Sequence, residues 1–205
     1  MARDTRSIVK LSRREGYALH PKAHKALAKR TNMPGQSANY RSRSKPSQYS
    51  LQLREKQKVK RLYGLLEKQF SNLMAEASRS QGNSGAALLQ LLEQRMDNAV
   101  YRAGFAPSRR AARQLVTHGH FMLNGRRVDI PSIRLRIGDE ITLRPRSKDS
   151  EYFKKLDDIS PAPSAIPTWE SVDRKKISLK ITNLPVRDDA EPDINEQLIV
   201  EYYSR

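Results

Sequence analysis

Residues 108–143 constrain the fold of this chain more than any other segment, because their pattern specifies a helix followed by three short strands. The helix is predicted to begin at Ser108, a residue type that caps helices, and to end at Gly119. Two turn dipeptides separate the strands: Asn124-Gly125 and Gly138-Asp139. We therefore expect a small module that has one apolar face to fold on and one face rich in guanidinium groups.

The basic side of the predicted helix is formed by arginines that lie three and four residues apart. This spacing places side chains on one side of a helix, and here the residues are Arg109, Arg110 and Arg113. Fixed positive charge on a rigid element suits the phosphate backbone of a nucleic acid. We expect replacement of Arg109 and Arg113 by alanine to weaken RNA binding and to leave the fold intact.

His118 and His120 flank Gly119 at the end of this helix, and two interpretations apply. One is favourable placement of imidazole at the C-terminal end of the helix dipole. The other is contact with an RNA phosphate or base. We favour RNA contact, because the neighbouring arginines mark the same surface.

The charge of the chain points to a polyanionic partner. Its 39 Lys and Arg residues outnumber 22 Asp and Glu residues, for a formal net charge of +17 over 205 residues. Such a charge opposes compaction unless a polyanion neutralises it, so nucleic acid is the first candidate and an anionic membrane surface the second. No apolar stretch approaches the roughly 20 residues that span a bilayer, and the N-terminus lacks the apolar core of a signal peptide. We expect a cytoplasmic protein without a membrane partner.

The chain contains no cysteine, which excludes disulfides, thiolate metal sites and a cysteine nucleophile. His20 and His24 lie four residues apart, but two ligands do not form a structural zinc site. Asp97, a lone acid with Arg95 and Arg102 nearby, is better explained as an ion-pair partner than as a catalytic group. No Gly-rich phosphate loop or nucleophile–base set is present in the sequence. We therefore predict no catalytic residues, no metal and no other cofactor.

Charge and periodicity divide the chain into four segments. Residues 1–49 form a basic N-terminal arm with few large apolar residues. Residues 50–93 show the three-and-four apolar spacing of helices. Residues 94–150 form the RNA-binding module and carry a net charge of +7. Residues 151–205, with a net charge of −3, are expected to form a proline-rich connector, a strand and a helix that complete the helical domain.

Five segments carry a resemblance to a known family. They are KLSRREG at residues 10–16, YSLQLREKQKVKRLYGLLEKQF at 49–70, LLQLLEQRMDNAVYRAGF at 88–105, SRRAARQLVTHGHFMLNGRRVDIPS at 108–132 and NEQLIVEYYSR at 195–205. Their order and extent make the chain similar to the small-subunit ribosomal protein S4 family of bacterial or organellar type. The match covers almost the whole chain and is therefore more specific than the RNA-binding module alone.

The resemblance implies an α+β, mainly helical fold. A discontinuous helical domain would be interrupted by a small helix-plus-β-strand RNA-binding module, with a basic extended N-terminal arm. Residues 50–93 and the C-terminal part would pack together, with residues 94–150 inserted between them in sequence.

The resemblance also implies a structural constituent of the small ribosomal subunit. Such a protein binds 16S rRNA directly, nucleates assembly of the subunit body and contributes to translational accuracy. The implied partners are 16S rRNA, ribosomal protein S5 and other small-subunit proteins, and mRNA near its entrance channel.

The basic pattern and the resemblance together give the expected site residues. RNA-binding side chains are expected at Arg13, Arg14, Lys56, Lys58, Arg61, Arg109, Arg110, Arg113, His118, His120, Asn124 and Arg126. Residues near the mRNA entrance are Arg41, Arg43 and Lys45, and residues that contact another protein are Leu198, Val200 and Tyr202. Many family members bind zinc through a cysteine knuckle near the N-terminus. Here Val9 and Ser12 stand at its first two positions, so we expect the zinc-free variant.

Two alternatives of other classes use the same module. The first is an RNA-modifying enzyme, such as a pseudouridine synthase or a tyrosyl-tRNA synthetase, which would need a large catalytic domain. The second is a stand-alone regulatory RNA-binding factor, which the module and the charge would fit but the nearly full-length resemblance does not.

Overall fold

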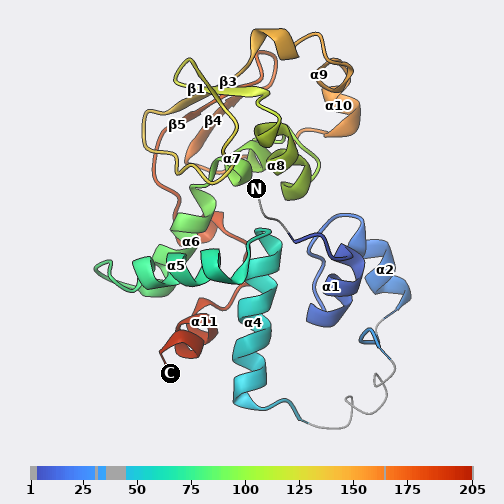
Figure 1. The fold of residues 1–205 in the computed structure, drawn as a ribbon, viewed down its shortest axis with the longest axis vertical. Helices are drawn as coiled ribbons and strands as arrows, with labels where there is room; N and C mark the ends of the chain where they lie inside the picture. The colour runs from blue at the N-terminus through green and yellow to red at the C-terminus, as the bar shows by residue number, and fades with distance from the viewer. Residues whose placement is uncertain (1–3, 31, 36–44, 164, 205) are drawn as a thin grey trace. The chain divides into compact units, whose positions relative to one another are not determined.

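The structure, a computed structural model, describes residues 4–30, 32–35, 45–163 and 165–204. Figure 1 shows many helices and one small sheet, in agreement with the mainly helical α+β fold that the sequence predicts. The chain divides into two compact units, residues 1–88 with 192–205 and residues 89–191. The first unit is therefore discontinuous in sequence and interrupted by the second, as predicted.

Helices with apolar sides form the main body of the first unit. They are α4 (Gln48–Leu62), α5 (Glu67–Ala77), the first half of α6 (Ser84–Glu93) and α11 (Glu196–Tyr203). α11 packs along α4, and its Ile199 is fully buried. The Tyr203 ring of α11 lies 6.3 Å from the Phe70 ring of α5. The last helix of the chain is thus an integral part of the apolar core of this unit.

Two short helices, α1 (Ile8–Glu15) and α2 (Ala23–Lys29), form the N-terminal part of this unit. They pack against each other, and α1 packs on α4. The Glu15 carboxylate is fully buried and forms ion pairs with Arg54 and Arg61 of α4. Residues 4–30 are therefore more regular than the extended arm that the sequence predicted, because a buried acid ties them to α4.

A five-stranded antiparallel sheet organises the second unit, with strand order β2-β1-β3-β5-β4. The strands are β1 (Phe121–Leu123), β2 (Arg126–Val128), β3 (Glu140–Leu143), β4 (Glu170–Asp173) and β5 (Ser178–Ile181). The helices of this unit are the second half of α6, α7 (Met96–Arg102), α8 (Arg109–Thr117), α9 (Glu151–Lys154) and α10 (Leu156–Ile159), with short 3₁₀ turns η1 (Pro145–Ser147) and η2 (Arg187–Asp189). The predicted helix and three strands of residues 108–143 are all present.

The sequence predicted a domain boundary after residue 150, and the structure divides the chain differently in this region. Residues 151–191 belong to the second unit, and only the segment from residue 192 onward joins the first. The reason is strand pairing: β5 hydrogen-bonds to β3, and β4 extends the sheet beyond β5. Leu179 lies opposite Ile141 in this register, and both side chains are buried. An alternating strand needs a neighbour that buries its apolar side, and β3 provides that neighbour.

Buried side chains of α7, α8 and the sheet form a single core in the second unit. Phe121 of β1 contacts two further aromatic rings, with centroids 6.3 Å from Phe105 and 6.1 Å from Phe153. Trp169, which precedes β4, is fully buried in the same cluster. This core fixes the positions of the helix and strand ends that carry the exposed charges of the unit.

Glu170 of β4 is a buried acid in this unit. Its side chain has no hydrogen-bond partner for either carboxylate oxygen among the described residues. Burial raises the pKa of Glu170 well above its ordinary value of 4.5, and the nearby Glu93 and Asp189 raise it further, whereas Arg102 opposes the shift. The folded protein therefore holds Glu170 in its protonated form to a higher pH than the unfolded chain does.

We expect Glu170→Gln to stabilise the protein at and above neutral pH. Because the pKa of Glu170 is higher in the folded than in the unfolded protein, the contribution of this residue to stability is fully present below pH 4.5. It is lost as the pH rises through the pKa of Glu170 in the folded protein. Glutamine does not ionise, so the variant should gain stability at high pH and little at the acidic end. Thermal unfolding across pH measures the difference. Glu140→Gln, on an exposed residue of the same sheet, is the control, and an equal gain there would contradict the explanation.

Candidate nucleic-acid interface

Arg109 and Arg113 of α8 turn toward acids of their own unit. Ser108 caps the helix by accepting a hydrogen bond from the Ala111 backbone N–H. Arg113 then lies with Nη1 2.8 Å from Asp97 Oδ2, and its side chain is 12% exposed. Arg109 donates from Nε to the Asn98 side-chain oxygen and from Nη2 to Glu191. Both guanidinium groups therefore attach α8 to neighbouring segments of the second unit.

The acids that receive these arginines belong to a larger buried network. Asp97 also accepts two hydrogen bonds from Arg95, at 3.0 and 2.8 Å. Glu93 accepts two hydrogen bonds from Arg102 and one from the Asn98 amide. Charged groups this far from water need partners of this kind. The network confirms that Asp97 is an ion-pair partner, and it gives Arg109 and Arg113 structural partners that the spacing argument did not foresee.

Three predicted RNA-binding residues of α4 also have partners within the first unit. Lys56 is buried, pairs with Glu67 at 2.5 Å and lies 4.5 Å from the centroid of the Tyr202 ring. Arg61 pairs with the buried Glu15. Lys58 pairs with Glu55 at 2.8 Å and donates to the Asp193 backbone oxygen at 2.7 Å. The basic side of α4 is therefore largely occupied by contacts within the protein.

The turn between β1 and β2 uses Asn124 for its own structure. This residue has a positive φ of 48°, and its side chain bonds in both directions. Its amide Nδ2 donates to Asp139, and its Oδ1 accepts from the Glu140 backbone N–H. Asn124 therefore links the two predicted turns to each other, and any contact with RNA stays a prediction.

The two histidines at the end of α8 differ in environment. His118 is exposed, whereas His120 is partly buried and its Nδ1 lies 3.0 Å from Ser147 Oγ. Burial lowers the pKa of His120 below its ordinary value of 6.5, and His118 and Arg144 lower it further. Burial and the neighbouring positive charges thus favour the neutral form of His120 in the free protein.

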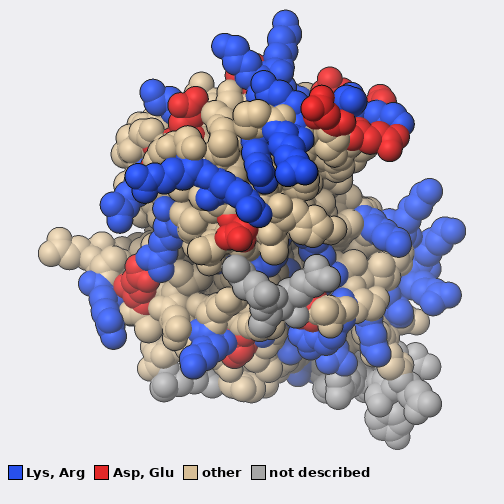
Figure 2. Space-filling view, turned by 45° about the horizontal axis from the view of Figure 1, so that its top comes forward, with Lys and Arg blue, Asp and Glu red and all other residues tan. Residues whose placement is uncertain are grey.

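One group of exposed cations in the second unit comes from α8, from β2 and from the segments that follow β2 and β3. They are Arg110, Arg126, Arg127, Arg134, Arg136, Arg146 and Lys148. Only Arg110 and Arg126 were predicted. The others lie in edge-strand and turn positions, where helical spacing carries no information, although the density of arginine in residues 126–148 was visible in the sequence. Figure 2 shows Lys and Arg side chains spread over one face of the molecule, with Asp and Glu confined to smaller groups.

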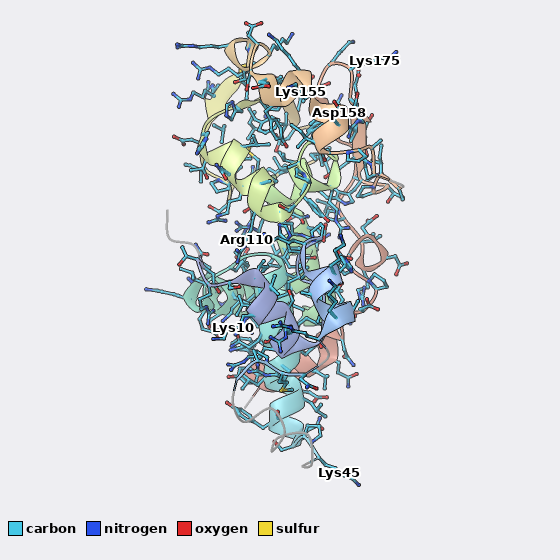
Figure 3. The ribbon with its side chains drawn as sticks, turned by 90° about the vertical axis from the view of Figure 1, so that its right-hand side faces the viewer. Lys10, Lys45, Arg110, Lys155, Asp158 and Lys175 are labelled. Atoms are coloured by element: carbon cyan, nitrogen blue, oxygen red, sulfur yellow. The ribbon has the colours of Figure 1, made fainter. Side chains whose placement is uncertain are left out.

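The remaining predicted basic residues lie in the N-terminal part. Arg14 is exposed on α1, and Arg13 donates to the Asn32 backbone oxygen. Lys45 is exposed, and Figure 3 shows its side chain pointing outward from the ribbon. Arg41 and Arg43 lie outside the described residues.

The predicted protein-contact residues lie on α11. Leu198, Val200 and Tyr202 are half-buried. The Tyr202 ring lies 5.8 Å from the ring of Tyr49, which is 49% exposed at the start of α4. The two helices therefore share a partly apolar, aromatic surface.

The residues near the N-terminus do not fit a zinc site. Ser12 is fully buried, donates from Oγ to the Ile8 backbone oxygen and accepts from the Leu19 backbone N–H. The described residues contain no cluster of three or more His, Cys, Asp or Glu side chains able to hold a metal ion. In many family members a cysteine that binds zinc occupies this position. Here the Ser12 hydroxyl occupies it and makes two hydrogen bonds to the backbone. Within the described part of the chain, no helix is long and apolar enough to cross a membrane.

Comparison with known proteins agrees with this geometry. The family model of the ribosomal protein S4/S9 N-terminal domain matches residues 3–93, and that of the S4 domain matches residues 94–141. Small ribosomal subunit protein uS4 of Roseiflexus castenholzii is 48% identical over 206 residues, covering 100% of both chains. The protein of the same name from Heliobacterium modesticaldum is 48% identical over 211 residues, and that from Pelodictyon phaeoclathratiforme is 50% identical over 206 residues, each with complete coverage of both chains.

These matches and the basic S4 module define an RNA-binding structural protein of the small ribosomal subunit rather than an enzyme. The chain belongs to the ribosomal protein S4 family. Its partners are accordingly ribosomal RNA and other ribosomal proteins.

Arg113→Ala should destabilise the second unit instead of leaving the fold intact. The substitution removes one of the two guanidinium groups on the buried Asp97 carboxylate, so we expect a loss of about 1–3 kcal/mol in the free energy of unfolding. Urea unfolding measures it. Arg126→Ala, which removes the same charge from an exposed position, should change stability by less than about 0.5 kcal/mol. Equal effects of the two substitutions would show that the ion pair does not stabilise α8.

Proposed function

We propose that this protein binds 16S rRNA directly, nucleates assembly of the body of the small subunit and contributes to translational accuracy. The observation that carries the proposal is the set of exposed arginines and lysines that surround β2, β3 and their turns. Each such contact with phosphate releases condensed counterions, which makes binding strong at low salt and weak at high salt.

Rigid cations on a folded module favour recognition of RNA shape over base sequence. The exposed groups are held on strands, tight turns and a helix end, whose positions the apolar core fixes. Folded RNA offers phosphates and 2′-hydroxyl groups in a defined spatial pattern, while the base edges of its helices are hard to reach. A junction of helices in the 5′ domain of 16S rRNA is the target that this surface fits.

The predicted RNA-binding residues divide into two roles under this proposal. Arg14, Arg110, His118 and Arg126 are exposed and contact RNA directly. Lys56, Arg61, Arg109, Arg113 and Asn124 have partners within their own units and stabilise the elements that carry exposed cations there. Arg13, Lys58 and His120 are partly buried and contact RNA through the part of each side chain that solvent reaches.

Two further contacts belong to the same proposal. Arg41, Arg43 and Lys45 bind mRNA near the entrance of its channel, and the outward direction of the Lys45 side chain supports this. The surface of α11 and the start of α4, with Leu198, Val200 and Tyr202, contacts ribosomal protein S5. The exposed Tyr49 and Leu51 beside α11 supply apolar area for such a contact.

Salt-dependent binding of the whole protein to the 5′ domain of 16S rRNA tests the proposal. We expect the affinity to fall steeply with salt, and we expect an excess of an unrelated folded RNA of similar length to leave most of the complex intact. Filter binding at several salt concentrations measures both. Equal affinity for the two RNAs would show that charge alone drives binding, and would remove the proposed direct recognition.

Deletion of residues 196–205 should weaken the fold of the first unit more than the binding of RNA. α11 buries Ile199 and bonds to α4 and α5 through the pairs Gln52–Glu201 and Tyr203–Glu67. We expect a lower melting temperature and an affinity for 5′-domain RNA within about threefold of the full chain at low temperature, because the deleted helix carries no lysine or arginine within residues 196–204. A large loss of affinity in a folded truncated protein would place the helix in the RNA interface.

A further inference from the structure

The segment between α8 and β1 has an unusual steric relation with β2. Gly119 ends the helix with a positive φ of 70° and is buried. A Cβ atom built on Gly119 would lie 2.7 Å from Nε and 2.9 Å from Nη2 of Arg127. The guanidinium group of Arg127 therefore occupies the space that a side chain at position 119 would fill. Because Gly119 has no side chain, the Arg127 guanidinium can pack directly against its backbone, and we call this arrangement the seat of Arg127.

Arg144 approaches the same segment from the opposite side. The sheet order β2-β1-β3 places β1 between the strand that carries Arg127 and the strand that precedes Arg144. The Arg144 backbone N–H donates to the His120 oxygen at 2.9 Å, which holds Arg144 beside the start of β1. Two arginines thus flank residues 119–120, and the exposed His118 lies next to them.

Neither of these arginines forms a salt bridge within the described part of the chain. In contrast, Arg113 and Arg109 of α8 form ion pairs with Asp97 and Glu191, respectively. Arg127 is in addition an exposed residue. A guanidinium that already packs against the backbone loses less side-chain entropy on binding than one that extends freely into water, and its planar fork matches the geometry of a phosphate group.

We propose that Arg127, seated on Gly119, and Arg144 bind adjacent phosphate groups of the RNA backbone at the start of β1. The inference rests on the proposed RNA-binding function and specifies one site within it. Gly119 acts as a positioning residue, because it determines where the Arg127 guanidinium lies without touching RNA through a side chain.

Binding of 5′-domain 16S rRNA to the full chain and to matched variants tests this site. We expect Arg127→Ala to weaken binding about tenfold and to reduce the salt slope by about one. Arg127→Lys should restore the salt slope but only part of the affinity, because lysine keeps the charge and lacks the fork. Lys175→Ala removes a charge from the exposed β4–β5 turn of the same unit, where Figure 3 shows the side chain pointing outward, and should leave the affinity unchanged.

A double-mutant cycle tests whether Gly119 affects RNA affinity by positioning the Arg127 guanidinium. Gly119→Ala keeps every charge, and it should weaken binding by displacing the Arg127 guanidinium. If Gly119 acts through Arg127, the affinity of the double variant Gly119→Ala with Arg127→Ala should equal that of whichever single variant binds RNA more weakly. Additive losses would overturn the seating role, and thermal unfolding of each variant confirms that the proteins compared are folded.

The outcomes distinguish the two levels of the proposal. If the unmodified protein prefers 5′-domain RNA and Arg127→Ala binds equally well, the phosphate site is refuted while the RNA-binding function stands. If the unmodified protein shows no preference over the unrelated RNA, the proposed function is refuted together with this site. Arg127→Ala is the decisive variant even if Gly119→Ala does not fold, because it places no side chain at a positive-φ position.

Discussion

The buried carboxylate of Asp97 is the point on which the geometry of the RNA-binding module depends. It receives Arg95, which caps the start of α7, and Arg113 from α8, each at 2.8 Å, so this acid of α7 ties α8 to α7. Removing charges from water is costly, and the cost is offset only when each charge has well-placed partners. The pairs thus hold α8 in one position. That position in turn fixes Gly119, the start of β1 and the exposed cations beside it.

The large positive charge of the chain is therefore divided between two physical tasks. Lys56, Arg61, Arg109 and Arg113 pair with acids and rings inside their own units, where they act as structural ties. Arg126, Arg127, Arg146 and Lys148 remain at the surface. A net charge of +17 does not distinguish these groups, yet their functions differ, because only a cation that water reaches can exchange its counterions for RNA phosphates.

Local patterns predicted the module well and its surroundings poorly. The helix cap at Ser108 and the turns at Asn124-Gly125 and Gly138-Asp139 depend on near neighbours, and all three features are present. The sequence placed the strand now seen as β5 with the helical domain, because its partner β3 lies more than 30 residues earlier in the chain and pairing at that distance leaves no local trace. The seat of Arg127 on Gly119 depends in the same way on a strand folding back onto a helix end.

The sequence by itself determined the class of protein: helices and short strands set by periodicity, a basic chain suited to RNA, no cysteine chemistry, and a family resemblance in consecutive segments. Only the tertiary structure decided which cations serve the fold and which serve the surface. Spacing along a helix shows that Arg109, Arg110 and Arg113 are neighbours. It does not show that Asp97 and Glu191, distant in sequence from each other, approach Arg113 and Arg109 in the folded chain. Ion pairing is set by distances between side chains in space, and these exist only once the chain has folded.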